Sequence, residues 1–233
     1  GGLRHSEQRH TLKSLSDENP YIHSYATNQT ILSGNAILQN LKRTDSDELY
    51  VAMRNVLGKD EVFEGSAAYG TVQNLAHFVG VANGTYNRFL VDYIDVKQLH
   101  INANYDRKIN NIISVNANAN YYNWDKEVYH KPNFKASLSA PVNLRDKIKV
   151  APSLSYIGKR KTNSSFDLEP VFLPVIVEEL PSQFHMNLGV YYNYTKNISA
   201  YLQLNNLTNS KQDMWIGYRE VGFNGLFGLN YSF

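Results

Sequence analysis

The chain closes with Gly222-Phe-Asn-Gly-Leu-Phe-Gly-Leu-Asn-Tyr-Ser-Phe233, and the alternation within this stretch decides the fold. Counted back from the terminal aromatic residue, large apolar side chains share one parity: Phe233, Tyr231, Leu229, Phe227 and Phe223. The other parity is small or polar, apart from Leu226. A period of two residues indicates a β-strand with one apolar face and one polar face.

Six earlier segments repeat this alternation, at residues 99–105, 113–121, 134–142, 148–156, 184–194 and 198–205. Most are roughly 9–12 residues long, the length with which a tilted strand crosses a bilayer, whereas ordinary sheet strands average about five or six. Short connections (106–111, 143–146 and 195–197) alternate with long ones (123–132, 159–182 and 207–221). A membrane barrel has short periplasmic turns and longer extracellular loops. The sequence therefore predicts an all-β fold, an antiparallel transmembrane β-barrel connected as a meander.

Composition agrees with that prediction. Hydrophobic residues make up 42% of the chain, yet the mean hydropathy is −0.42, as expected when alternate strand residues face water. Tyrosine, with 17 residues, is the commonest aromatic and suits a membrane–water boundary. No window approaches the 18 or so consecutive apolar residues of a transmembrane helix. The absence of cysteine excludes disulfides, and a net charge of +2 from scattered residues gives no nucleic-acid surface.

Upstream of residue 87 the pattern weakens. Residues 47–56 and 61–72 are predicted to form a strand pair, and 87–105 one long strand that protrudes from the membrane or bends at a bulge, since Asp95 and Lys97 fall on its apolar parity. Pro152 interrupts another run and marks a weak point or bulge there. We divide the chain into residues 1–45, mostly extracellular loop with part of a strand, and residues 46–233, the barrel strands. This gives about 9–10 strands, a partial barrel from a larger protein, and the initial Gly1-Gly2 also favours a fragment.

Several segments resemble the C-terminal barrel portion of TonB-dependent outer-membrane receptors of the kind abundant in Bacteroidota. The resemblance is carried by Leu202-Gln-Leu-Asn-Asn-Leu-Thr-Asn-Ser-Lys211, by the hairpin at Thr195-Lys196-Asn197, and by the terminal strand. It extends to Asp95–Tyr105, Lys131–Ser139 and Tyr156–Arg160. It implies a barrel of about twenty-two strands, a plug domain and energised nutrient uptake in the bacterial outer membrane. Contact with TonB would pass through a plug domain that these residues do not include.

The polar parity of the runs is the predicted lumen-facing surface. Its amide and imidazole side chains suit contacts to a ligand, hydration, or packing on a plug. These residues are His100, Asn102, Asn104, Asn116, Asn118, Asn120, His185, Asn187, Gln203 and Asn205.

The long loops combine aromatic and basic residues, and Trp124, Tyr129, Arg160, Trp215 and Tyr218 are the predicted extracellular contacts to a ligand. A membrane-anchoring aromatic girdle is the alternative. We predict no catalytic, cofactor or metal site. No Gly-x-Ser-x-Gly pattern is present, and the spacing of His5 and His10 fixes no metal geometry.

Three functional classes follow. The first is an outer-membrane receptor that takes up a nutrient ligand of unknown identity. The second is a non-energised channel or a structural barrel subunit of an envelope complex, and the third is a soluble β-rich adhesin. The expected partners are outer-membrane lipid and the barrel-insertion machinery. The resemblance implies that this machinery recognises the terminal strand through Phe227, Leu229, Tyr231 and Phe233.

Overall fold

The computed structural model describes residues 1–22, 41–83, 86–145, 147–168, 171–172 and 176–232. Within them the chain forms sixteen strands and one short helix. The long strands are β1 (Gly2–Arg9), β2 (Arg43–Gly58), β3 (Glu61–Asn83), β4 (Tyr86–Lys108), β5 (Ser114–Trp124), β6 (Phe134–Ser139), β8 (Ile148–Ile157), β9 (Arg160–Leu168), β12 (Gln183–Asn193), β13 (Ile198–Asn205) and β16 (Asn224–Tyr231). The shorter elements are α1 (Leu12–Glu18), β7 (Val142–Leu144), β10 (Val171–Phe172), β11 (Ile176–Leu180), β14 (Asp213–Trp215) and β15 (Tyr218–Arg219).

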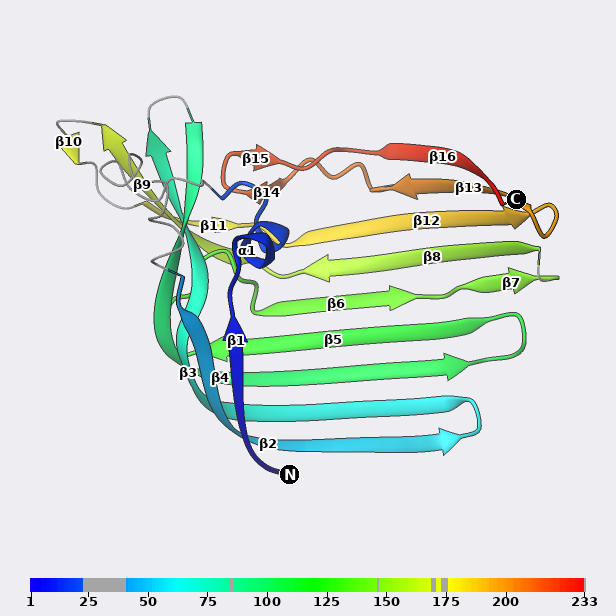
Figure 1. Cartoon of the computed structure of the whole chain (residues 1–233), viewed down its shortest axis with the longest axis horizontal. Coiled ribbons are helices and arrows are strands. Elements are labelled where there is room, and N and C mark those ends of the chain that lie inside the picture. The colour runs from blue at the N-terminus through cyan, green and yellow to red at the C-terminus, as the bar shows by residue number, and fades with distance from the viewer. Residues whose placement is uncertain (23–40, 84–85, 146, 169–170, 173–175, 233) are drawn as a thin grey trace.

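Ten strands follow one another in a single antiparallel path, β1-β2-β3-β4-β5-β6-β8-β12-β13-β16 (Figure 1). This confirms the predicted antiparallel meander and its strand number. The predicted pair around residues 57–60 is β2 and β3, and the tenth strand is β1, within the first 45 residues. Among the described residues β1 and β16 end the path without pairing to each other, so the sheet is an open segment of a barrel wall.

The register gathers the apolar parity of β2 to β16 along this path on one face, which Leu3 of β1 joins. Leu3 pairs with Leu49, Leu49 with Tyr69, and Tyr69 with Leu99 at one side of the sheet. At the other side the same face continues through the rows Val150–Val190–Leu202–Phe227 and Ile148–Tyr192–Ala200–Leu229. This face is exposed, with Leu49 62%, Phe227 65% and Leu229 70% accessible. An uncovered apolar face of this extent fits contact with lipid rather than with a second sheet. No helix of the described residues is long and apolar enough to cross a membrane.

The predicted bulge exists, but it lies in β3 rather than in β4. The register shifts between Val72 and Leu75, and Asn74 adopts a left-handed backbone with φ 51°. The Asn74 backbone amide donates to Asp95 Oδ1 at 2.7 Å. At this position the carboxylate of a β4 side chain therefore accepts the hydrogen bond that a backbone carbonyl of β4 would accept in a regular ladder. Beyond this point β3 and β4 bend away from the other strands (Figure 1). The bend carries their distal halves over the long-loop end of the sheet.

Two prolines interrupt the ladder at one place. The β8 register continues from β6 to β7 without a shift, with Ser139 opposite Ser153 and Val142 opposite Val150. Between them Ala140 donates to the Pro152 carbonyl at 3.2 Å, while neither Pro141 nor Pro152 has an N–H to donate. The predicted weak point at Pro152 is therefore a gap in the ladder and not a bulge.

Of residues 1–45, the structure describes 1–22 and 41–45, which include a strand and a helix, and the predicted loop over 23–40 lies outside the described residues. β1 pairs along its whole length with β2, although Leu3 is its only large apolar residue and so gives no alternation. The helix α1 is only seven residues long, which is too short for a helical period to predict it from the sequence. It begins at a capping box in which Thr11 and Ser14 exchange side chain–backbone hydrogen bonds of 2.9 and 3.0 Å.

Two predicted loops and one predicted turn are corrected. Residues 159–182 contain the hairpin of β9 and β11, and β9 also pairs in parallel with β3 at Gly80–Ala82. Residues 207–221 contain the β14–β15 hairpin. The predicted turn 143–146 begins later, because β7 continues to Leu144.

Candidate ligand-binding site at the long-loop end of the sheet

The long-loop end of the sheet is covered by a compact aromatic cluster, which we call the cap. Trp215 of the β14–β15 hairpin meets Phe78 and Phe89 edge-on, with ring centroids 5.3 and 5.4 Å apart, and stacks on His130 at 5.0 Å. Phe78 and Phe89 are fully buried. The cap thus brings together the distal halves of β3 and β4, the β5–β6 loop and the β14–β15 hairpin.

Buried polar contacts hold the hairpin against the sheet. Arg160 donates to the Met214 carbonyl at 2.7 Å, and Gln183 Nε2 donates to the Asp213 carbonyl at 2.9 Å. His185 lies 2.8 Å from the Glu220 carboxylate. Arg160 is only 5% exposed, and this burial lowers the pKa of its guanidinium. Each contact joins the start of β9 or β12 to the hairpin, so the hairpin is fixed relative to the wall.

The N-terminal segment completes one side of the cap. Tyr21 stacks on Tyr218 with ring centroids 3.8 Å apart, and Ile22 forms an isolated bridge with Phe89. Glu18 at the end of α1 pairs with Lys131 of the β5–β6 loop. The Tyr21–Tyr218 contact joins residues near opposite ends of the chain, and the other two join the N-terminal segment to β4 and to the β5–β6 loop.

A cavity of about 310 Å³ lies between the cap and the polar face of the wall. Aromatic rings from both sides line it, including Tyr122 and Trp124 of β5 and Trp215 of the hairpin. Lys131, Lys135 and Arg160 also line it, and Glu18 is the one acidic residue among the described residues of its lining. Trp124 is oriented by donating its Nε1–H to Gln98 at 2.8 Å and by stacking on Tyr122 at 5.6 Å. The cavity combines flat aromatic surface with an excess of positive charge.

Five of the ten predicted lumen residues form one hydrogen-bonded ladder on β4 and β5, below the cavity. His100 contacts Asn120 at 3.1 Å, and its ring stacks on Tyr122 at 4.3 Å. Four amides then bond to one another in series: Asn102 to Asn120 at 3.0 Å, Asn104 to Asn102 at 2.8 Å, Asn118 to Asn104, and Asn120 to Asn118 at 2.7 Å. Asn116 donates separately to the Asp106 carboxylate. All lie on the face opposite the apolar one, and that this face lines a lumen stays a prediction. Because the amides satisfy one another, the ladder suits a rigid polar wall better than a flexible contact surface.

The remaining predicted lumen residues have separate roles. His185 pairs with Glu220 in the cap, and Asn187 Oδ1 accepts the Asn206 amide at 2.9 Å. Gln203 donates to the Tyr191 hydroxyl at 3.2 Å, and Asn205 to Asn224 at 3.1 Å. No periodic signal predicts the Glu220 or Asn206 partners, because both lie in irregular segments.

The predicted loop contacts converge, but not as an exposed surface. Trp124 and Arg160 lie in strands, as the last residue of β5 and the first of β9, which corrects their assignment to loops. Arg160 and Trp215 are buried, and Tyr218 stacks on Tyr21. Tyr129 stacks on His77 at 5.4 Å, at the edge of the cap. Trp124, Arg160 and Trp215 all line the cavity, so contact of these three with a ligand stays a prediction.

His5, Glu7 and Asp45 place ligand atoms within 4.8 Å of one another, a grouping that the sequence did not suggest. Arg43 already pairs with Glu7 at 2.9 Å and with Asp45 at 2.8 Å. The cluster therefore has its own counter-charge, and we assign it no metal.

Phe227, Leu229 and Tyr231 of the predicted insertion signal lie on the exposed apolar face of β16, and Phe233 lies outside the described residues. β16 pairs only with β13 among the described strands.

The fold of this chain is similar to part of several solved outer-membrane receptors and transporters. P. aeruginosa FpvA in complex with a heterologous pyoverdine superimposes with a TM-score of 0.64 at 14% identity, covering 98% of this chain and 30% of that one. The copper transporter OprC gives 0.60 at 12% identity, covering 99% and 36%, and the ferric-catecholate import receptor Fiu from K12 E. coli gives 0.59 at 13%, covering 99% and 32%. No family model and no curated protein matches the sequence.

These solved structures are TonB-dependent outer-membrane receptors, and the chain has the fold of their barrel wall. It spans about a third of their length.

Proposed function

We propose that this chain is the barrel portion of a TonB-dependent outer-membrane receptor, of the kind abundant in Bacteroidota, that takes up a nutrient ligand. The observation that carries the proposal is the combination of an exposed apolar face along ten paired strands with a capped cavity at the long-loop end. The likeness in fold to receptors for pyoverdine and ferric catecholates, and to a copper transporter, supports it. TonB would act through a plug domain outside these residues.

The cavity favours a ligand that is flat and negatively charged. Tyr122, Trp124 and Trp215 offer ring surfaces for stacking. Lys131 is paired with Glu18, and Arg160 donates to a hairpin carbonyl. Lys135 forms no ion pair within 4 Å among the described residues, although the charge of Glu18 also acts on it. Lys135 is therefore the cation we expect to meet the ligand directly.

Uptake by the full-length protein tests the proposal. Cells that depend on the receptor would be supplied with a panel of iron and copper chelates, and accumulation of the labelled metal would be measured. We expect Trp124→Ala and Lys135→Gln to reduce uptake of one chelate at least tenfold with normal surface levels. Lys149→Gln, in β8 of the same wall but outside the lining of the cavity, is the matched control. Equal uptake by all variants for every chelate would contradict the proposal.

The two alternatives have distinct outcomes. A non-energised channel would conduct ions in planar bilayers and would transport without TonB. A soluble adhesin would stay in solution without detergent, which the exposed apolar face opposes.

A further inference from the structure

Two residues that line the cavity under the cap each keep a buried polar atom without a hydrogen-bond partner among the described residues. The atoms are Nε2 of His130 and Nε of Arg160, and both residues are only 5% exposed. Buried polar groups are nearly always hydrogen-bonded, so an unpaired one needs an explanation. Because both residues line one cavity, a group bound there explains the two atoms together.

The unpaired nitrogen of His130 is a hydrogen-bond acceptor. Its other ring nitrogen, Nδ1, lies 3.2 Å from the Phe78 carbonyl oxygen, which can only accept, so Nδ1 carries the proton. The ring is uncharged at neutral pH, because burial lowers the pKa of His130 to about 3. Nε2 therefore keeps its lone pair, and the stack on Trp215 holds the ring in this orientation.

Arg160 adds a donor and a positive charge close to this acceptor. Its charge is one of the causes that lower the pKa of His130. The two described hydrogen bonds of its guanidinium go to uncharged carbonyls of the β14–β15 hairpin. The carboxylate of Glu220 acts on this charge, but it pairs with His185 at 2.8 Å. A buried cation held only by neutral acceptors is costly, and a bound anion offsets that cost.

We propose that His130 and Arg160, with Lys135, bind a phosphate group that carries a proton. The O–H of the phosphate donates to Nε2 of His130, while its charged oxygens accept from Arg160 Nε and attract Lys135. An anion without a proton, such as sulfate, would place a second lone pair against that of Nε2. The inference rests on the cavity of the proposed function and narrows its ligand. The rings of Tyr122 and Trp124 would stack on a flat ring that carries the phosphate.

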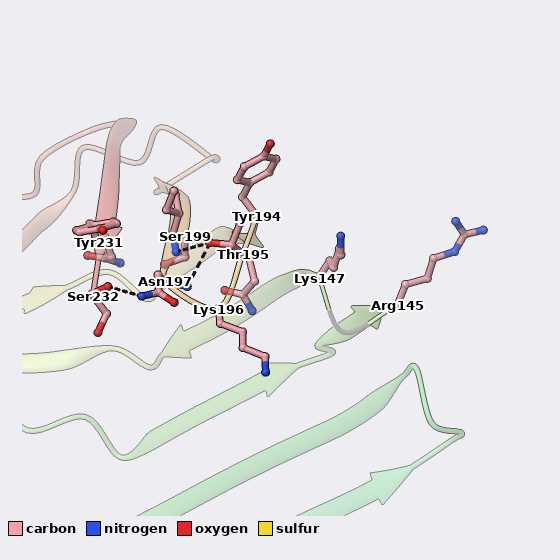
Figure 2. A pocket seen from close by; sticks show the side chains of 12 residues that line it. Arg145, Lys147, Tyr194, Thr195, Lys196, Asn197, Ser199, Tyr231 and Ser232 are labelled. Atoms are coloured by element: carbon pink, nitrogen blue, oxygen red, sulfur yellow. Dashed lines mark hydrogen bonds between the residues drawn. The ribbon is translucent and has the colours of Figure 1, made fainter.

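The larger hollow at the short-turn end lacks this combination. It measures about 720 Å³ and lies around the β7–β8 and β12–β13 turns, with Lys147 and Lys196 in its lining (Figure 2). Both lysines are exposed, and none of its described lining residues keeps a buried polar atom without a partner. Asn197, for example, donates its Nδ2 to the Ser232 carbonyl at 2.7 Å (Figure 2). Lys196 therefore offers a control for the effect of removing a lysine elsewhere in the wall.

Binding of inorganic phosphate and of sulfate to the purified full-length protein at pH 6.0 tests the proposal by isothermal titration calorimetry. Sulfate has the shape of phosphate but carries no proton and more negative charge at this pH, so charge alone favours sulfate. We expect the wild-type protein to bind phosphate at least tenfold more tightly than sulfate. His130→Phe keeps an aromatic ring against Trp215 and should reduce this preference to about twofold or less. His130→Gln, whose amide has a donor and an acceptor, should keep most of it.

The lysine variants separate charge from the acceptor. Lys135→Gln should weaken both anions about equally, whereas Lys196→Gln should change neither. A loosened cap would also weaken both anions together, so the preference for phosphate is what reports the acceptor. Equal affinity for the two anions in the wild-type protein, an unchanged preference in His130→Phe, or an equal loss in His130→Gln would overturn the proposal.

Phenyl phosphate distinguishes two sources of the phosphate group. About half of a phosphate monoester keeps its proton at pH 6.0. We expect phenyl phosphate to bind about fivefold more tightly than inorganic phosphate, and Trp124→Ala to remove that gain. Equal affinity of the two would assign the site to free phosphate. These measurements need no uptake: a preference for phosphate without uptake would contradict the proposed function alone, and uptake of a chelate without binding of any probe would overturn this inference alone.

Discussion

Trp215 stacks on His130 with ring centroids 5.0 Å apart and an angle of 16° between the ring planes. The two residues come from the β14–β15 hairpin and the β5–β6 loop, so this contact joins two long loops directly. Trp215 also packs on Phe78 and Phe89, which makes it the residue through which the parts of the cap meet.

Replacing Trp215 with alanine should open the cap and leave the sheet assembled. Loss of a buried tryptophan side chain costs about 3–5 kcal/mol. We expect rapid protease cleavage within residues 125–133 in the assembled full-length protein. Leu202→Ala, on the exposed apolar face, is the control and should leave cleavage unchanged. Slow cleavage in Trp215→Ala would show that the loop is held by other contacts.

Acidification should loosen the same cap through His130. Burial, helped by the nearby charges of Arg160, His77 and Lys131, lowers the pKa of His130 from 6.5 to about 3. Between pH 3 and 6.5 the unfolded chain binds a proton on His130 that the folded cap does not bind. The stability of the cap is therefore greatest above pH 6.5 and falls as the pH decreases toward 3. At pH 4.5 the cap should be roughly 2–3 kcal/mol less stable than at pH 7.5.

Hydrogen exchange of residues 125–133 at the two pH values, corrected for intrinsic rates, measures this effect. His130→Gln removes the titrating group and should flatten the pH dependence, at the expense of stability at pH 7.5. An equally steep pH dependence in that variant would assign the effect to another group.

Asn206 should control the start of the loop that carries Trp215. Its side chain donates to the Ser210 carbonyl at 2.7 Å and the Val221 carbonyl at 3.0 Å, and its Oδ1 accepts from Thr208 and Ser210 at 3.0 Å. It is buried, with φ 50°. Asn206→Gly keeps the backbone conformation and removes these bonds, at about 0.5–1.5 kcal/mol each. We expect roughly tenfold or faster hydrogen exchange in residues 207–222, with Asn209→Gly, exposed at φ 52°, as the comparison.

The two parities of the strands should report different environments. Spin labels at Leu188, Leu202 and Leu229 should be accessible to oxygen from the lipid phase. Labels at Asn187, Gln203 and Asn230 should be accessible to a water-soluble relaxation agent. An interchange of the two sets would contradict the membrane orientation of the sheet.

The sequence predicted the wall of this protein far better than its cap. Alternation in residues such as Leu188, Val190 and Tyr192 is a local signal, and the register preserves it across the sheet. β9 begins Arg160-Lys-Thr-Asn163, which has no alternation, and its strand conformation depends on distant partners in β11 and β3. Trp215 likewise owes its burial to Phe78 and Phe89. Contacts of this range leave no periodic trace in the sequence.

Assembly of the protein should depend on the apolar row of β16 and on Phe233. Phe227, Leu229 and Tyr231 form an exposed apolar row on β16, and Phe233 follows on the same parity of the sequence. Because the sheet ends at β16 among the described strands, this row is available to the machinery that inserts barrels. We expect Phe233→Asp to reduce surface-exposed full-length protein several-fold, while Ser232→Ala leaves it unchanged. The described hydrogen bonds of Ser232 to Asn197 use its backbone amide and carbonyl, which alanine retains.

Membrane energetics alone would not produce the Phe233→Asp defect. A charge near the interface costs only about 0–1 kcal/mol, against about 2–4 kcal/mol at the midplane for the most costly residues. A large loss would therefore reflect lost recognition of the strand. Phe233→Tyr keeps the aromatic ring and should restore surface levels, which separates recognition from hydrophobicity alone. Equal surface levels for Phe233→Asp and Ser232→Ala would show that Phe233 takes no part in insertion.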